Sequence, residues 1–91
     1  MNSNILGSYL KRKRVEMGMA QADVASKLGY TTPQYISNFE RGVCQPSLKI
    51  AGKLAGLYKL DMKEFFDVIM EQQKSDISEI LFKQKRTRRK A

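Results

Sequence analysis

The spacing of small, turn-forming and apolar residues between Gln21 and Phe39 constrains the fold of this chain more than any other feature. Ala25 is a small residue within a short helical pattern, and Gly29 follows that pattern where a left-handed C-terminal cap is expected. Four apolar residues are spaced to be buried at a helix crossing: Val24, Leu28, Ile36 and Phe39. Two short helices that cross closely need this combination. The sequence therefore predicts helices at 21–28 and 33–41 joined by a tight turn.

The residues on either side of this helix pair also predict helices. A first helix is expected from Ile5 to Met17, capped by Ser3 or Asn4 and ended by Gly18. Its apolar positions are Leu6, Tyr9, Leu10 and Met17. The 33–41 helix has a capping hydroxyl at Thr31 or Thr32 and proline at its first position.

A further helix is predicted from Leu48 to Tyr58, with Ser47 as its cap. Its inward residues are expected to be Leu48, Ala51, Leu54 and either Ala55 or Leu57. The sequence therefore predicts four helices before residue 60.

Two groups of apolar residues follow Asp61, and a polar gap at 72–76 separates them. The first group is expected to complete the core: Met62, Phe65, Phe66, Ile69 and Met70. The second group is Ile77, Ile80 and Leu81, which would be exposed on a monomer and therefore predicts a homodimer interface. The segment forms either one long helix or two. Residues 83–91 have no apolar face, so we expect them to be disordered when unbound.

Composition excludes several kinds of chemistry. The chain has 91 residues, no histidine and a single cysteine, Cys44, so we expect no intramolecular disulfide, no zinc or other metal site, and no cofactor. The glycines are dispersed and form no phosphate-binding loop, so we expect no enzymatic activity. No apolar run approaches the roughly 18 residues of a membrane span, and we expect a cytoplasmic protein that does not bind membranes.

Charge varies along the chain. Residues 1–60 have nine Lys and Arg against three Asp and Glu, residues 61–82 have two against six, and residues 83–91 have six bases and no acid. The total of +8 suits a polyanionic partner. The basic 83–91 tail has three interpretations: a DNA-binding arm, a solubilising end, or a signal for another partner.

The order of these residues resembles that of the phage repressor and Cro family of helix-turn-helix proteins, over about residues 6–66. The matching residues are Leu10, Arg14, Gly18, Met19, Gln21, Val24, Ala25, Leu28, Gly29, Tyr35, Ile36, Ser37, Phe39, Glu40, Arg41, Gly42, Pro46 and the 48–57 helix. The resemblance implies an all-α, lambda-repressor-like five-helix domain at 1–70, with its motif at 21–41. A helical extension at 71–82 and the basic tail at 83–91 would follow.

The resemblance also implies roles for individual residues in binding double-stranded DNA. Base contacts would come from Thr32, Gln34 and Asn38. Phosphate contacts would come from Gln21, Thr31, Tyr35, Ser37, Arg41 and Lys49. Arg14 and Glu40 would form a structural ion pair.

Two departures from the family pattern affect the motif. The distance from Gly29 to Glu40 is one residue longer than usual, which predicts a lengthened turn at 30–32. Ala20 replaces the usual capping hydroxyl, and Asp23 is expected to compensate in part.

The combined expectation is an XRE-like transcriptional regulator, acting as a repressor and dimeric on a pseudo-palindromic operator. One alternative is an antitoxin whose 72–91 segment holds a partner protein. A second alternative is a protein-interaction adaptor that no longer reads DNA.

Overall fold

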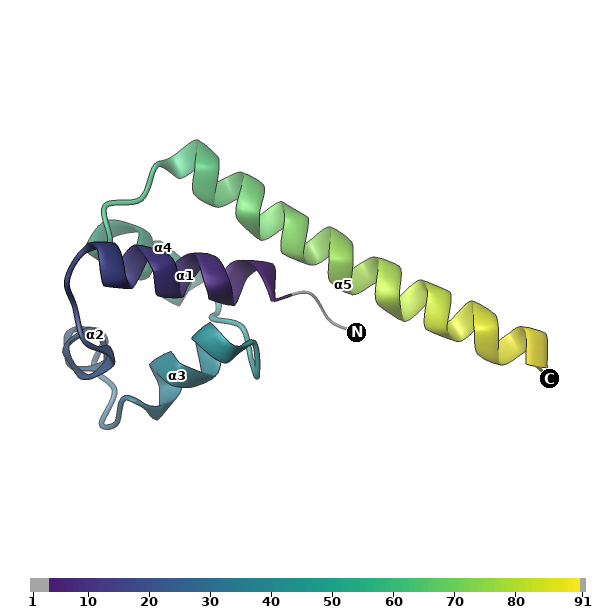
Figure 1. Cartoon of the computed structure of the whole chain (residues 1–91), viewed down its shortest axis with the longest axis horizontal. Coiled ribbons are helices and arrows are strands. Elements are labelled where there is room, and N and C mark those ends of the chain that lie inside the picture. The colour runs from purple at the N-terminus through teal and green to yellow at the C-terminus, as the bar shows by residue number, and fades with distance from the viewer. Residues whose placement is uncertain (1–3, 91) are drawn as a thin grey trace.

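The computed structural model describes residues 4–90, with side chains described for residues 4–82, and these residues form five helices (Figure 1). The helices are α1 (Ile5–Glu16), α2 (Gln21–Leu28), α3 (Gln34–Arg41), α4 (Leu48–Leu57) and α5 (Met62–Lys90). The all-α prediction is confirmed, and the bounds of the first four helices agree with the predicted bounds to within one residue. α1 lies between α3 and α5 and packs against both.

α5 is one continuous helix of 29 residues, so the polar gap at 72–76 does not divide it. Its backbone stays helical to Lys90, through the segment for which the sequence predicts disorder in the absence of DNA. The side chains from residue 83 onward lie outside the described residues, as do Ser3 and Ala91. Disorder of the unbound tail stays a prediction.

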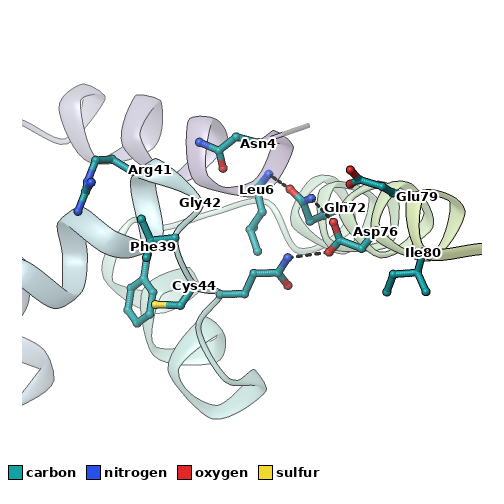
Figure 2. A pocket seen from close by; sticks show the side chains of 12 residues that line it. Asn4, Leu6, Phe39, Arg41, Gly42, Cys44, Gln72, Asp76, Glu79 and Ile80 are labelled. Carbon is teal, nitrogen blue, oxygen red and sulfur yellow. Dashed lines mark hydrogen bonds between the residues drawn. The ribbon is translucent and has the colours of Figure 1, made fainter. Parts of the chain in front are cut away.

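Gln72 fixes α5 to the rest of the domain from inside the polar gap (Figure 2). Its buried Oε1 accepts the backbone N–H of Leu6 at 2.9 Å, which satisfies one of the N–H groups left unpaired at the start of α1. Gln72 Nε2 donates to Asp76 at 3.0 Å, and Asp76 accepts a hydrogen bond from Gln45 at 2.8 Å. The α3–α4 loop is thereby connected to α5 across a cleft of about 510 Å³.

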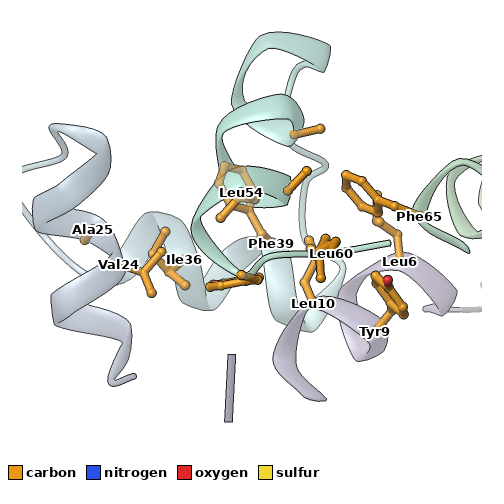
Figure 3. Packing of buried hydrophobic residues seen from close by; sticks show 13 residues of the cluster. Leu6, Tyr9, Leu10, Val24, Ala25, Ile36, Phe39, Leu54, Leu60 and Phe65 are labelled. Atoms are coloured by element: carbon orange, nitrogen blue, oxygen red, sulfur yellow. The ribbon is translucent and has the colours of Figure 1, made fainter. Parts of the chain in front are cut away.

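Side chains from all five helices and from the α4–α5 turn meet in one hydrophobic core (Figure 3). Its members are Leu6, Tyr9, Leu10, Val24, Ala25, Ile36, Phe39, Ala51, Leu54, Ala55, Tyr58, Leu60 and Phe65. Burying a side chain the size of leucine or phenylalanine contributes about 1.5–3 kcal/mol. Because Val24, Ile36 and Phe39 are among these buried residues and Leu28 is partly buried, the predicted inward faces of the 21–28 and 33–41 helices are confirmed.

Several predicted core residues are exposed instead. Leu48 is 82% exposed because it is the first residue of α4, beyond the edge of the core, and Met17 lies past the last turn of α1. α5 covers the core with the face that contains Phe65, Val68 and Ile69. Three residues on its other faces therefore point into solvent, namely Met62, Phe66 and Met70.

Gly7 lies at the point where α1 crosses α3. A Cβ atom at this position would lie 2.6 Å from the carbonyl oxygens of both Phe39 and Glu40, so only glycine permits this crossing. The prediction that the Asn4 side chain caps α1 is wrong. Its Nδ2 instead donates to the Glu40 carbonyl at 2.8 Å. The start of α1 is thus fastened to the end of α3.

Replacing Gly7 with alanine is expected to lower the free energy of unfolding by about 1–3 kcal/mol, because the added methyl group meets backbone atoms that cannot move independently. Gly52→Ala is the matched control, since Gly52 is helical and its Cβ would meet open space. This control is expected to raise stability by about 0.5–1 kcal/mol. Urea unfolding followed by circular dichroism measures both changes, and equal effects would contradict the close crossing.

Candidate nucleic-acid interface

The Arg14–Glu40 ion pair fixes α3 against α1. Arg14 Nε lies 2.6 Å from Glu40 Oε2, and its Nη2 donates to Oε1 at 3.2 Å. The side chains are only 11% and 3% exposed, so this is a two-point contact in a largely dry environment. Hydrogen bonding to Glu40 raises the pKa of Arg14, against the opposing effect of burial.

Two further contacts attach the start of α2 to this ion pair. Arg14 Nη1 donates to the backbone carbonyl of Met19 at 2.7 Å, and Gln21 Nε2 donates to Glu40 Oε1 at 3.0 Å. Gln21, expected from the resemblance to contact phosphate, therefore also has a structural partner that the sequence did not indicate. Glu40 also influences Tyr58 nearby: burial, reinforced by the negative charge of Glu40, raises the pKa of the Tyr58 hydroxyl to about 12.

The outer face of α3 carries a connected row of polar side chains. Gln34 Nε2 donates to Asn38 Oδ1 at 2.9 Å, and Arg41 Nη2 donates to the same oxygen at 2.8 Å. Arg41 Nε also donates to Ser37 Oγ at 3.1 Å. The structure thus brings four of the predicted DNA-contacting residues together on one helix face, while Ile36 and Phe39 hold the opposite face in the core.

The turn before α3 presents the other predicted contacts at its N-terminal end. Thr31 and Thr32 are exposed, and Thr32 Oγ1 accepts the backbone N–H of Gln34 at 3.0 Å. This hydrogen bond leaves the Thr32 hydroxyl hydrogen available to donate. α3 begins at Gln34, one residue later than predicted: Pro33, and not a threonine, occupies the capping position, and the helix has no side-chain cap there.

Aromatic stacking stabilises the lengthened turn. The rings of Tyr30 and Tyr35 stack with centroids 4.4 Å apart, and Tyr30 meets Phe39 edge to face at 6.3 Å. Gly29 adopts a φ of 85°, and the N–H of Tyr30 bonds to the Ala25 carbonyl at 2.9 Å. The extra residue is therefore accommodated in a turn anchored to the core, and the stacking also holds Tyr35 in the first turn of α3.

α1 contains four consecutive basic residues at 11–14, and part of this run faces α5. Arg12 and Lys13 lie over the Tyr9 ring, each 5.5 Å from its centroid, and Lys13 is 3.5 Å from Glu64. Tyr9 donates to Glu64 Oε1 at 2.9 Å, a hydrogen bond that lowers the pKa of Glu64. These cations have partners within the domain. By contrast, Lys49, a predicted phosphate contact, lies exposed in the first turn of α4.

Among the described residues, no helix has both the length and the apolar character that crossing a bilayer requires. The same part of the chain holds no group of three His, Cys, Asp or Glu side chains that could bind a metal ion.

The closely crossed α2–α3 pair, with a polar face of α3 turned outward, defines a helix-turn-helix domain of the kind that binds DNA. The family model described as helix-turn-helix matches residues 10–65, more than half of the chain, and the protein belongs to this family. The expected relation to XRE-like transcriptional regulators is thereby confirmed, and this family is DNA-binding and not typically enzymatic. Comparison with curated proteins and comparison with solved structures each gave no match.

Replacing Arg14 with methionine is expected to lower the free energy of unfolding by about 3 kcal/mol, because Glu40 would keep a buried charge without its partner. The double variant Arg14→Met/Glu40→Met removes both charges and is expected to recover much of this loss. Chemical denaturation of Arg14→Met, Glu40→Met and the double variant measures the coupling. Losses that simply add in the double variant would show that the pair does not act as a unit.

Proposed function

We propose that this protein is a sequence-specific transcriptional repressor that binds a pseudo-palindromic operator as a homodimer. The polar outer face of α3 carries this proposal, because Gln34 and Asn38 project one turn apart from a helix fixed on its other side. A major groove admits such a helix, and side-chain amides match the hydrogen-bonding edges of bases. Repression is favoured over activation because occupying an operator needs no further surface.

The contacts fall into two groups in this proposal. Thr32, Gln34 and Asn38 approach base edges, and Gln34 reads adenine with its amide. A second group binds phosphates on both sides of the groove: Gln21, Thr31, Tyr35, Ser37, Arg41 and Lys49. Each of these side chains is exposed or half-buried, which supports both assignments.

Selection of bound duplexes from a random pool tests direct readout. The Gln34→Ala variant is expected to lose discrimination at one base pair, at a cost of about 1–3 kcal/mol there, because the reading amide is removed. Lys49→Ala is the cleaner phosphate control, since Gln21 also supports Glu40; it is expected to weaken all duplexes alike. Unchanged base preference in Gln34→Ala would refute the assignment.

The dimer in this proposal forms through α5. Ile77, Ile80 and Leu81 are more than half exposed, and Phe66 and Met70 continue the apolar face toward the domain. Residues 66, 70, 73, 77 and 80 alternate in steps of four and three, which is the spacing of a helix that packs along another helix. A second copy would cover this face and place two recognition helices on one operator.

Sedimentation equilibrium of the full chain tests the dimer. The wild-type protein is expected to sediment as a dimer and the Ile77→Glu/Ile80→Glu variant as a monomer. Burying the two glutamate charges of each chain in the α5–α5 interface would cost too much free energy. Val15→Glu is the matched control, since Val15 is 58% exposed like Ile80 but lies on α1. A wild-type chain that sediments at the monomer mass would exclude the dimer.

The same exposed α5 face supports a second candidate function, in which residues 72–91 hold a different protein. The domain would then act as an antitoxin that also binds DNA, or as an adaptor that does not. A stable heterocomplex with the product of a neighbouring gene would favour the antitoxin. Failure to bind any duplex at low salt would favour the adaptor.

A further inference from the structure

The hydrogen bonds on the outer face of α3 have a direction that Arg41 imposes. A guanidinium group has only N–H donors and no acceptor. The atom of Asn38 that faces Arg41 Nη2 at 2.8 Å must therefore be the amide oxygen. Because Gln34 contacts that same oxygen at 2.9 Å, its facing atom must be the amide nitrogen. One donor-only side chain thus orients two amides in sequence.

This orientation decides which atoms remain for DNA. A carbonyl oxygen has two lone pairs, and Asn38 Oδ1 already accepts from both Gln34 and Arg41. Asn38 therefore presents its Nδ2 donors. Gln34 keeps its Oε1 acceptor and one Nε2 hydrogen outside this chain of bonds.

The two amides consequently match different bases. Adenine offers a donor at N6 beside an acceptor at N7, which suits the remaining donor and acceptor of Gln34. Guanine offers two acceptors, O6 and N7, which suit a group that only donates. An asparagine without this constraint pairs with adenine in the usual bidentate way.

We propose that Arg41 determines base preference at the Asn38 position, by turning the Asn38 amide so that its N–H donors face the groove and select guanine. This inference rests on the proposed DNA-binding function and deepens it. Arg41 acts here as a positioning residue on α3, whereas the family resemblance implied a phosphate contact alone. Ser37 supports the role, since its Oγ accepts from Arg41 Nε at 3.1 Å and holds the guanidinium along the helix face.

The test first locates the base pair at which Asn38→Ala loses preference in duplexes selected by the wild-type protein. Binding is then measured for four duplexes that differ only at that base pair. The wild-type protein is expected to prefer guanine over adenine by roughly tenfold. Arg41→Met frees the Asn38 amide to rotate, so this preference is expected to disappear or reverse toward adenine.

Two further variants make the result specific. Arg41→Gln can present either oxygen or nitrogen to Asn38, so it is also expected to lose the guanine preference and replaces Arg41→Met if that variant unfolds. Lys49→Ala is the control, because an exposed phosphate contact should weaken all four duplexes by a common factor and keep the preference.

Three outcomes overturn the inference. A common loss of affinity across the four duplexes in both Arg41 variants would show that Arg41 serves the DNA backbone alone. A wild-type preference for adenine at this position would show that the Asn38 oxygen faces the groove. Failure of the wild-type protein to bind any duplex would instead refute the proposed DNA-binding function, and this inference with it.

Discussion

The buried pair of Arg14 and Glu40 is the contact on which the arrangement of the helices around the binding face depends. Glu40 accepts from Arg14 and Gln21 through its carboxylate and from Asn4 through its backbone carbonyl, so α1, the start of α2 and the end of α3 meet at one residue. A buried carboxylate is tolerated only when its acceptors are satisfied in this way. Arg41, the next residue, projects along the outer face, so adjacent residues fix the helix and order its polar surface.

α1 connects the two parts of the molecule that the proposed function uses. Its first turn contacts α3 closely at Gly7, and the N–H of Leu6 bonds to Gln72 on α5. Gln72 also reaches Asp76, which bonds to Gln45 in the loop after α3. α3 and α5 are therefore oriented by the same short segment. The direction in which α5 leaves the domain is set beside the α3–α4 loop.

Local signals made most of the fold predictable, whereas contacts between distant residues were not. Gly29 and Ser47 mark helix ends by their own chemistry, and the structure places them there. The burial of Gln72 was not predictable because a glutamine in a polar run resembles a solvent-exposed residue. The first apolar group of α5 is only partly in the core, because Phe65 and Phe66 are adjacent and periodicity alone does not say which of them faces inward. The Arg14–Glu40 ion pair was predictable only from the family resemblance. The hydrogen bonds that join Gln34, Asn38 and Arg41 on the outer face of α3 could be found only in the structure.

The extra residue between Gly29 and Glu40 lies in the turn before α3 and not within the helix. Stacking of Tyr30 on Tyr35 and the edge contact of Tyr30 with Phe39 hold this turn, so α3 itself keeps its regular geometry. Thr32 uses one lone pair of its hydroxyl to accept the first N–H of α3, which leaves it one lone pair and one hydrogen for other partners. Side chains on α3 are held by core packing on the opposite face, whereas Thr31 and Thr32 lie on an exposed turn. The hydrogen-bonded polar side chains on the outer face of α3, from Gln34 to Arg41, are therefore better preorganised to bind a ligand than Thr31 and Thr32 in the preceding turn.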